Sequence, residues 1–393
     1  MDLILLQKKI QENLLFNGTS GIVNPDHLAE EVRDVHLMNR NALSSILQEL
    51  VETLSKSSLG TSPVIHFGIA DSYRIDAFAA RLDPSDPKLI HHYLISIFHG
   101  VFQNFFSLYW GLLSHPKILP DIGQPNDEHP PFVHNKGLLD FCFNFPEATN
   151  QMEEFGRTWV TSFYPEDRNR QIYAQILANL SIEYLFMHEL SHILGGHIGY
   201  LMADKEKQGL FHFQPTILGS AAYHLNKGIP NIKVFEYEAD LIAGGLMASI
   251  VKFDRSLLGS FLEQEVSPPQ DMYQALALAI LILFHLFQEI RISYKKPQPY
   301  PEPDIRFWAA YGGITSHLRD EYGDEGVIKF ENAFSWAVKA YLGIIIELKL
   351  PVRFAFIGKK NYEGMTELDA LEEARKKLDP VLYPHSLWRQ AKS

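Results

Sequence analysis

The chain has 393 residues, of which 46% are hydrophobic and 21% charged, so it can bury a sizeable core and is not expected to be disordered. Its formal charge of -12, from 35 basic and 47 acidic residues, argues against a nucleic-acid-binding surface, which needs clustered Lys and Arg. Cys142 is the only cysteine, which excludes an intrachain disulfide and fits a reducing compartment. The apolar run Leu3 to Leu6 is far shorter than the hydrophobic part of a signal peptide, so we expect a cytoplasmic protein.

Residues 1–60 are expected to form an N-terminal helical region. Asp26 is a candidate N-cap for a helix over 27–35, and the leucine spacing over 43–54 favours a second helix. The Ser- and Gly-rich segment 55–62 marks the first boundary. We therefore expect three parts: the N-terminal region, a main domain over 61–320, and a C-terminal helical region over 321–393 packed on it.

Short runs of β-branched and aromatic residues predict a small mixed sheet near residues 64–100. The runs 73–82 and 91–97 flank the turn-rich sequence Asp-Pro-Ser-Asp-Pro, which favours a hairpin or another pair of neighbouring strands. The segment 141–145 is a candidate for a further strand. With the helices below, this pattern predicts an α+β fold that is predominantly helical.

Most of the remaining chain has helical periodicity. Helices are expected over 100–113, 168–195, 234–252, 270–291, 320–348 and 367–377, with the prolines of 297–303 forming an extended connector. Two apolar stretches, 94–113 and 275–287, were compared with membrane spans, which need roughly 20 largely apolar residues. The first contains His99, Gln103, Asn104 and Ser107, and the second has only 13 residues, so we expect buried core helices and no membrane span.

The segment His188-Glu189-Leu190-Ser191-His192 indicates a metal site. Two histidines four residues apart project from the same face of a helix, so both imidazoles can reach one ion. Glu189 can then reach a water on that ion, which is the HExxH arrangement of zinc proteases. The motif lies in a strongly apolar helix, where ionisable side chains are costly unless they are used. The alternative is that they are hydrogen-bonded core residues.

Catalytic zinc usually has three protein ligands, and the chain offers two candidates for the third. His197 follows His188 by nine residues, whereas the related pattern with a third histidine places it at the tenth, where this chain has Ile198. Glu236 and Asp240 are four residues apart and share one helix face. We expect Glu236 to be the ligand, with Asp240 accepting a hydrogen bond from a ligating histidine.

The intervening residues fit this interpretation. Glu238 should point elsewhere and not be a ligand. Ala239, Ala243 and Gly244 are small, which permits close approach to the motif helix. Without the upstream motif, the same acidic cluster would be interpreted as a solvent-exposed face.

The HExxH motif at 188–192 and the E-x-x-A-D motif at 236–240 together resemble the gluzincin metallopeptidases, particularly the CAAX-protease-like branch and its minimal relatives, the minigluzincins. The resemblance covers 181–247 directly, and a weaker similarity reaches back to 75–79 and 95–100. It implies a zincin-like core, with the small sheet packed on the motif helix, a Zn²⁺ cofactor and a peptide or protein substrate. Membrane-embedded members have spans that this chain lacks, so their substrate class does not carry over.

A further segment, residues 300–306, is similar to a His-Pro-x-x-x-x-Arg element of relatives, with Tyr300 in place of the histidine. Arg306 is expected either to pair with a buried carboxylate near the site or to form a structural salt bridge. Candidate transition-state stabilisers are Tyr300, His224 and Arg306, with Tyr223 and Tyr237 as further candidates for the oxyanion.

These residues predict an intracellular zinc endopeptidase. Glu189 would take a proton from a zinc-activated water and pass it to the leaving amine. One alternative is a non-hydrolytic zinc-binding sensor or scaffold derived from the same fold, for which a change at Glu189 or the third ligand would be expected. Another is a helical interaction protein with a fortuitous motif, which would bind metal substoichiometrically.

Overall fold

The structure of the protein is a computed structural model. It describes residues 3–16, 21–23, 63–72, 75–82, 91–128, 137–142, 164–203, 212–213, 231–253, 272–293, 300–352 and 359–386, with a few positions between 37 and 48. The expected helix over 27–35, most of that over 43–54, the boundary segment 55–62, Tyr223 and His224 lie outside the described residues.

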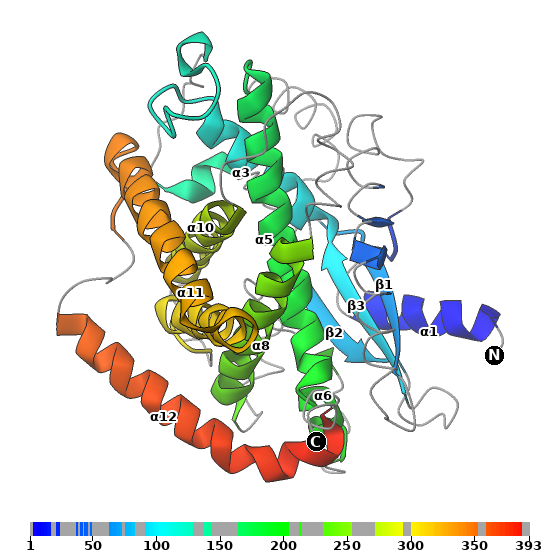
Figure 1. Cartoon of the computed structure of the whole chain (residues 1–393). Helices are drawn as coiled ribbons and strands as arrows, with labels where there is room; N and C mark the ends of the chain where they lie inside the picture. Colours follow the sequence, from blue (N-terminus) through cyan, green and yellow to red (C-terminus); the bar gives the residue numbers. More distant parts are fainter. Residues whose placement is uncertain are drawn as a thin grey trace.

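A four-stranded mixed sheet forms one layer of the molecule (Figure 1). Its order is β1 (Val64–Ala70), β3 (His92–Phe98), β2 (Ala77–Arg81) and β4 (His212–Phe213). β1 is parallel to β3, whereas β2 is antiparallel to both β3 and β4. The antiparallel pairing of β2 with β3 confirms the expected hairpin.

The expected strand over 141–145 is wrong where the structure describes it. Leu138–Phe141 form a 3₁₀ helix, η3, that packs between α3 (His99–Leu113) and α10 (Met272–Ser293). Ser107 Oγ donates a hydrogen bond of 2.7 Å to the Phe141 carbonyl, and the Phe141 ring lies against Gly111. Phe141 and Cys142, the described residues of that segment, are buried in the core beside helices instead.

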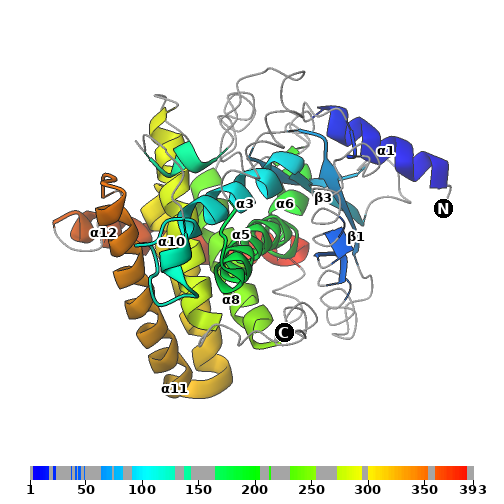
Figure 2. The same cartoon turned by 90° about the horizontal axis from the view of Figure 1, so that it is seen from above.

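Successive side chains of a strand point to opposite faces of the sheet, so the two faces pack into two different hydrophobic cores. Phe78, Ala80 and Leu94 face helix α1 (Leu3–Phe16), where Leu14 is fully buried. The opposite face, which includes Ala79, joins the main core with the helices. Viewed from above, α1 lies on one side of the sheet and the helices on the other (Figure 2).

Helix α5 (Arg168–Leu194) runs through the middle of the molecule and contacts β2, β3, α3 and α8 (Ile232–Phe253). The Asp167 side chain caps it by accepting from Arg170 N, and the turn after it uses Gly196 in the left-handed region, with φ of 84°. Arg170 is fully buried and donates hydrogen bonds to five carbonyls of the preceding loop, those of Leu113, His115, Ile118, Leu119 and Ile122. The expected long helix is therefore confirmed, with the sheet packed on it.

Helices α8, α10 and α11 (Pro303–Glu347) form the layer beyond α5 (Figures 1 and 2). Among the described residues, α10 is the one helix long and apolar enough to cross a membrane, and 83% of its apolar window is buried inside the structure, as in a core helix. Pro303 belongs to the first turn of α11 and not to the expected connector. Gly323, with φ of 65°, divides α11 into two segments, and the first begins well before the expected helix start at residue 320.

The two segments of α11 fold back on each other, since Phe307 and Tyr311 of the first contact Phe334 of the second. Helices α8 and α11 cross in backbone contact: a Cβ on Gly313 would lie 1.9 Å from the Leu241 carbonyl oxygen, and one on Gly244 would lie 2.1 Å from that of Ala310. Gly244 was expected to permit close approach to the motif helix, α5. Its lack of a side chain instead permits the close approach of α11.

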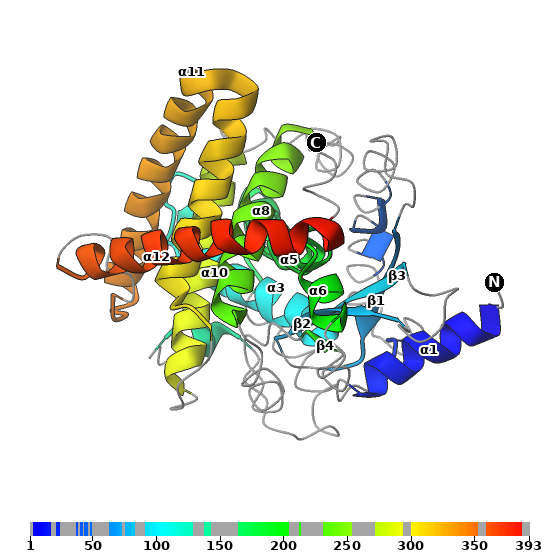
Figure 3. The same cartoon turned by 90° about the horizontal axis from the view of Figure 1, so that it is seen from below.

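The C-terminal helix α12 (Lys359–Leu382) crosses the underside of the molecule (Figure 3). It packs on α8 and on the short helix α6 (His197–Ala203), and it is followed by the 3₁₀ turn η5 (Tyr383–His385). The described structure confirms the expected predominantly helical α+β fold with a small mixed sheet.

Candidate metal centre

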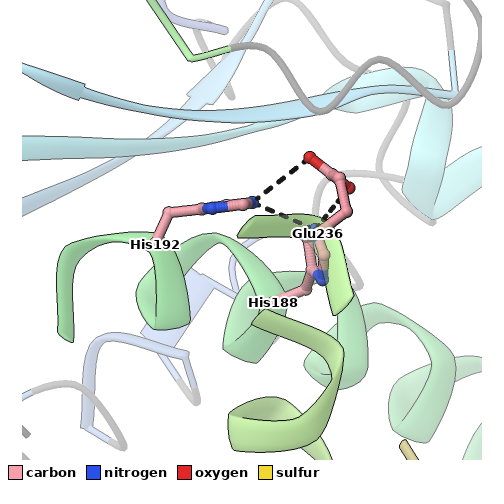
Figure 4. A group of neighbouring side chains, drawn as sticks. All are labelled: His188, His192 and Glu236. Atoms are coloured by element: carbon pink, nitrogen blue, oxygen red, sulfur yellow. Dashed lines mark hydrogen bonds and ion pairs between the residues drawn. The ribbon is translucent and has the colours of Figure 1, made fainter. Parts of the chain in front are cut away.

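Three buried side chains from two helices converge on one point (Figure 4). His188 and His192 project from α5 and Glu236 projects from α8. None of the three is more than 2% exposed. The structure thus brings together the three residues that the sequence indicated as a ligand set.

The spacing of their donor atoms fits a small tetrahedral ion. His188 Nε2 lies 3.2 Å from His192 Nε2 and 3.4 Å from a carboxylate oxygen of Glu236. His192 Nε2 lies 3.6 Å from the other oxygen of Glu236. Because zinc binds nitrogen and oxygen donors at about 2.0–2.1 Å, tetrahedral geometry places them about 3.3–3.4 Å apart. Two imidazoles and one carboxylate also suit zinc chemically.

Glu236 has the environment of a ligand. Among the described residues, neither of its carboxylate oxygens accepts a hydrogen bond, although both are buried. Buried polar atoms are normally hydrogen-bonded, so such an exception needs an explanation. A bound cation would satisfy both oxygens.

His188 is oriented by Asp240. His188 Nδ1 lies 2.8 Å from Asp240 Oδ1, which also accepts a hydrogen bond of 2.8 Å from the Tyr184 hydroxyl. A hydrogen on Nδ1 leaves the lone pair of Nε2 directed toward the cluster. The sequence anticipated this contact of Asp240. It missed Tyr184, which precedes His188 by four residues and therefore shares its helix face.

His192 is oriented through a second histidine. His192 Nδ1 lies 2.9 Å from His197 Nδ1, and His197 Nε2 lies 3.0 Å from Glu238 Oε2. His197 is fully buried, with its ring stacked on Phe235 at 4.8 Å. It therefore lies behind the His192 ring and not among the converging donors. His197 was the other sequence candidate for the third ligand, and Glu238, which was expected to point elsewhere, is the carboxylate that His197 contacts.

Arg306 of α11 supplies positive charge beside these carboxylates. Its Nε donates a hydrogen bond of 2.7 Å to Asp240 Oδ2, and its Nη2 donates one of 3.1 Å to Oδ1. The same Nη2 lies 3.3 Å from Glu236 Oε2 and 3.3 Å from His188 Nε2. The expected pairing of Arg306 with a buried carboxylate is confirmed, and it involves two carboxylates.

The charges of this network shift the pKa values of its members. Burial alone lowers the pKa of His188, but Asp240 and Glu236 outweigh it and raise the pKa to about 9. Burial, followed by nearby His188 and His197, lowers the pKa of His192 well below its usual value. The environment of His188 thus favours a cation at that ring, whether a proton or a metal ion.

Glu189 is buried beside the cluster and is 1% exposed. Burial is the largest cause that raises its pKa well above the usual value, and Glu236 and Asp76 raise it further, whereas His188 lowers it. Among the described residues, its Oε2 accepts no hydrogen bond. The protonation of Glu189 therefore depends on the charges beside it: negative charge favours its acid form, and positive charge favours its carboxylate form.

Two other expected site residues have different surroundings. The Tyr237 hydroxyl donates a hydrogen bond of 3.3 Å to Glu372 of α12, so this side chain faces the C-terminal helix. Tyr300 is buried in the main core, and its carbonyl accepts a hydrogen bond from Arg291. These contacts place the Tyr237 hydroxyl at α12 and the Tyr300 carbonyl at Arg291.

Comparisons with known protein families, with curated proteins and with solved structures found no match to this chain.

Proposed function

We propose that this protein is a gluzincin-type zinc endopeptidase with a zincin-like core, acting on peptides or proteins in the cytoplasm. The observation that carries the proposal is the convergence of two imidazole nitrogens and a carboxylate at 3.2–3.6 Å, with Glu189 buried next to them. This is the donor set of a catalytic zinc site, which keeps one position open for water or substrate.

Zinc bound there would lower the pKa of a water molecule, polarise the scissile carbonyl and, by its charge, stabilise the carboxylate form of Glu189. Glu189 would then accept the proton of the attacking water at its free Oε2 and deliver it to the leaving amine. Burial, together with the nearby Glu236 and Asp76 carboxylates, makes that carboxylate more basic than an exposed one.

The remaining residues of the network would hold the ligands. Asp240 keeps the Nδ1 proton on His188, and Arg306 keeps Asp240 in place with two hydrogen bonds. The Arg306 guanidinium also offsets part of the negative charge that Glu236 and Asp240 bring into the core.

The test separates metal binding from catalysis. Protein purified without added metal should contain one zinc per chain by elemental analysis, and His188→Ala should lose it. Glu189→Gln should keep the zinc, because Glu189 is not a ligand, and should lose hydrolysis of unfolded casein used as a general substrate. A chain without zinc, or a zinc content unchanged in His188→Ala, would refute the proposal.

The same experiment decides between the peptidase and the sensor or scaffold. Zinc in both wild type and Glu189→Gln, with no hydrolysis by either, would favour the non-hydrolytic alternative. Hydrolysis that persists in Glu189→Gln would show that another residue is the general base.

A further inference from the structure

The contacts behind His192 continue past His197 to the C-terminal helix. Glu238, which is 3% exposed, binds His197 through one oxygen and lies 3.5 Å from Arg375 Nη1 of α12 through the other. Arg375 is itself fixed by two hydrogen bonds of 2.8 Å to Glu372. A continuous chain of polar contacts therefore joins α12 to a side chain of the candidate metal centre.

The direction of the protons in this chain follows from Glu238. A carboxylate only accepts, so it selects the His197 tautomer with its proton on Nε2 and a lone pair on Nδ1. That lone pair can accept only from His192 Nδ1–H, and the His192 lone pair is then on Nε2, toward His188 and Glu236. Glu238 thus sets the tautomer of His192 through a second ring.

A second contact links the same C-terminal segment to the turn that precedes His197. Ser386 Oγ donates a hydrogen bond of 2.9 Å to the carbonyl of Leu194, at the end of α5. The backbone of His385 lies so close to Gly196 that a Cβ there would be 2.6 Å from it. The segment 359–386 therefore supports both Glu238 and the turn before His197.

We propose that His197 and Glu238 are positioning residues for His192, and that α12, through Arg375, completes the metal centre from outside its ligand set. This inference deepens the proposed function and rests on it. In the usual arrangement a carboxylate accepts a hydrogen bond directly from a ligating histidine. Here the His197 ring lies between the ligand His192 and the carboxylate of Glu238, and Arg375 forms a salt bridge with that carboxylate. Docking of α12 would then change metal affinity although α12 provides no ligand.

The test measures zinc affinity of the full chain by competition with a chelator. Glu238→Gln and His197→Ala should each weaken zinc binding about 10–100-fold, the usual effect of removing a group that orients a ligand. Arg375→Ala should weaken it less, about 2–5-fold, because the pair with Glu238 is partly exposed and long. Arg375→Lys should restore part of the loss.

A matched control is available on the same interface. Lys233 of α8 pairs with Glu367 of α12 at 3.2 Å, and both are more exposed than Glu238. Lys233→Ala removes this α8–α12 ion pair without touching His197, so its zinc affinity should equal that of wild type.

Cobalt substitution gives a readout that a purely structural effect would not change. The visible spectrum of the Co²⁺ form depends on the geometry of its ligands, so it should shift in Glu238→Gln even when circular dichroism and thermal unfolding of the metal-free protein match wild type. Wild-type affinity and spectrum in Glu238→Gln would overturn the inference and leave the metal centre intact. Absence of zinc from wild type would instead refute the metal centre itself.

Discussion

The crossing of α8 and α11 can be tested with one methyl group. In Gly313→Ala the new Cβ would lie 1.9 Å from the Leu241 carbonyl oxygen, whereas real Cβ contacts stay above 3.0 Å, so the helices must separate locally by at least the difference, 1.1 Å. Arg306 lies two turns earlier on α11 and reaches Asp240 at 2.7 Å, so the same shift lengthens that ion pair. Overpacking of this kind costs about 1–3 kcal/mol of unfolding free energy.

Gly312→Ala is the matched control, because it places the same methyl group one residue earlier. Its Cβ would meet only the Leu241 side chain, at an ordinary 3.7 Å. Helical Gly→Ala changes without strain stabilise by about 0.4–1 kcal/mol, so the free energies of unfolding of the two variants should differ by roughly 1.5–4 kcal/mol.

Urea titrations followed by circular dichroism measure both unfolding free energies, and chelator competition measures zinc affinity. Gly313→Ala should be less stable than wild type and bind zinc more weakly. Equal stability of the two variants would show that α8 and α11 do not meet in backbone contact.

Three further predictions concern buried charge. Asp240→Ala should weaken zinc binding about 10–100-fold, measured by chelator competition, because His188 loses its orienting partner; an unchanged affinity would contradict that role. In the metal-free protein, the pKa of His188 is raised to about 9, so its contribution to stability should be fully present below pH 6.5 and lost as the pH rises through 9. Urea titrations between pH 6 and 10 should show this decline, and a flat profile would contradict it. Arg170→Met should lower the unfolding free energy by about 3–5 kcal/mol, because it leaves buried Glu128 without its cation at 3.6 Å; a loss below about 1 kcal/mol in urea titrations would contradict a buried pair.

Local periodicity determined most of the helices. The long helix over 168–195 and the helices over 234–252 and 270–291 were predicted within a few residues, because their faces are apolar at the helical period and their ends carry turn residues. The prediction for 141–145 failed at Phe141, the end of a 3₁₀ helix, because a short apolar run fits a buried strand and a 3₁₀ turn in a core equally well. Only the contacts with Gly111 and Ser107 distinguish them.

For the site, the sequence by itself determined that His188 and His192 share one face of a helix, since a spacing of four residues fixes that geometry. It also indicated Glu236 and Asp240 as a pair. That this pair faces the histidines was decided by the packing of α8 on α5, two helices that no local rule orients relative to each other.

The roles of His197, Glu238 and Arg375 were decided by tertiary structure alone. Their contacts join the first residue of α6, the far face of α8 and an arginine of α12 that lies 137 residues beyond Glu238. Residue type and spacing along the chain carry no signal for such contacts, because they depend on where the C-terminal helix docks.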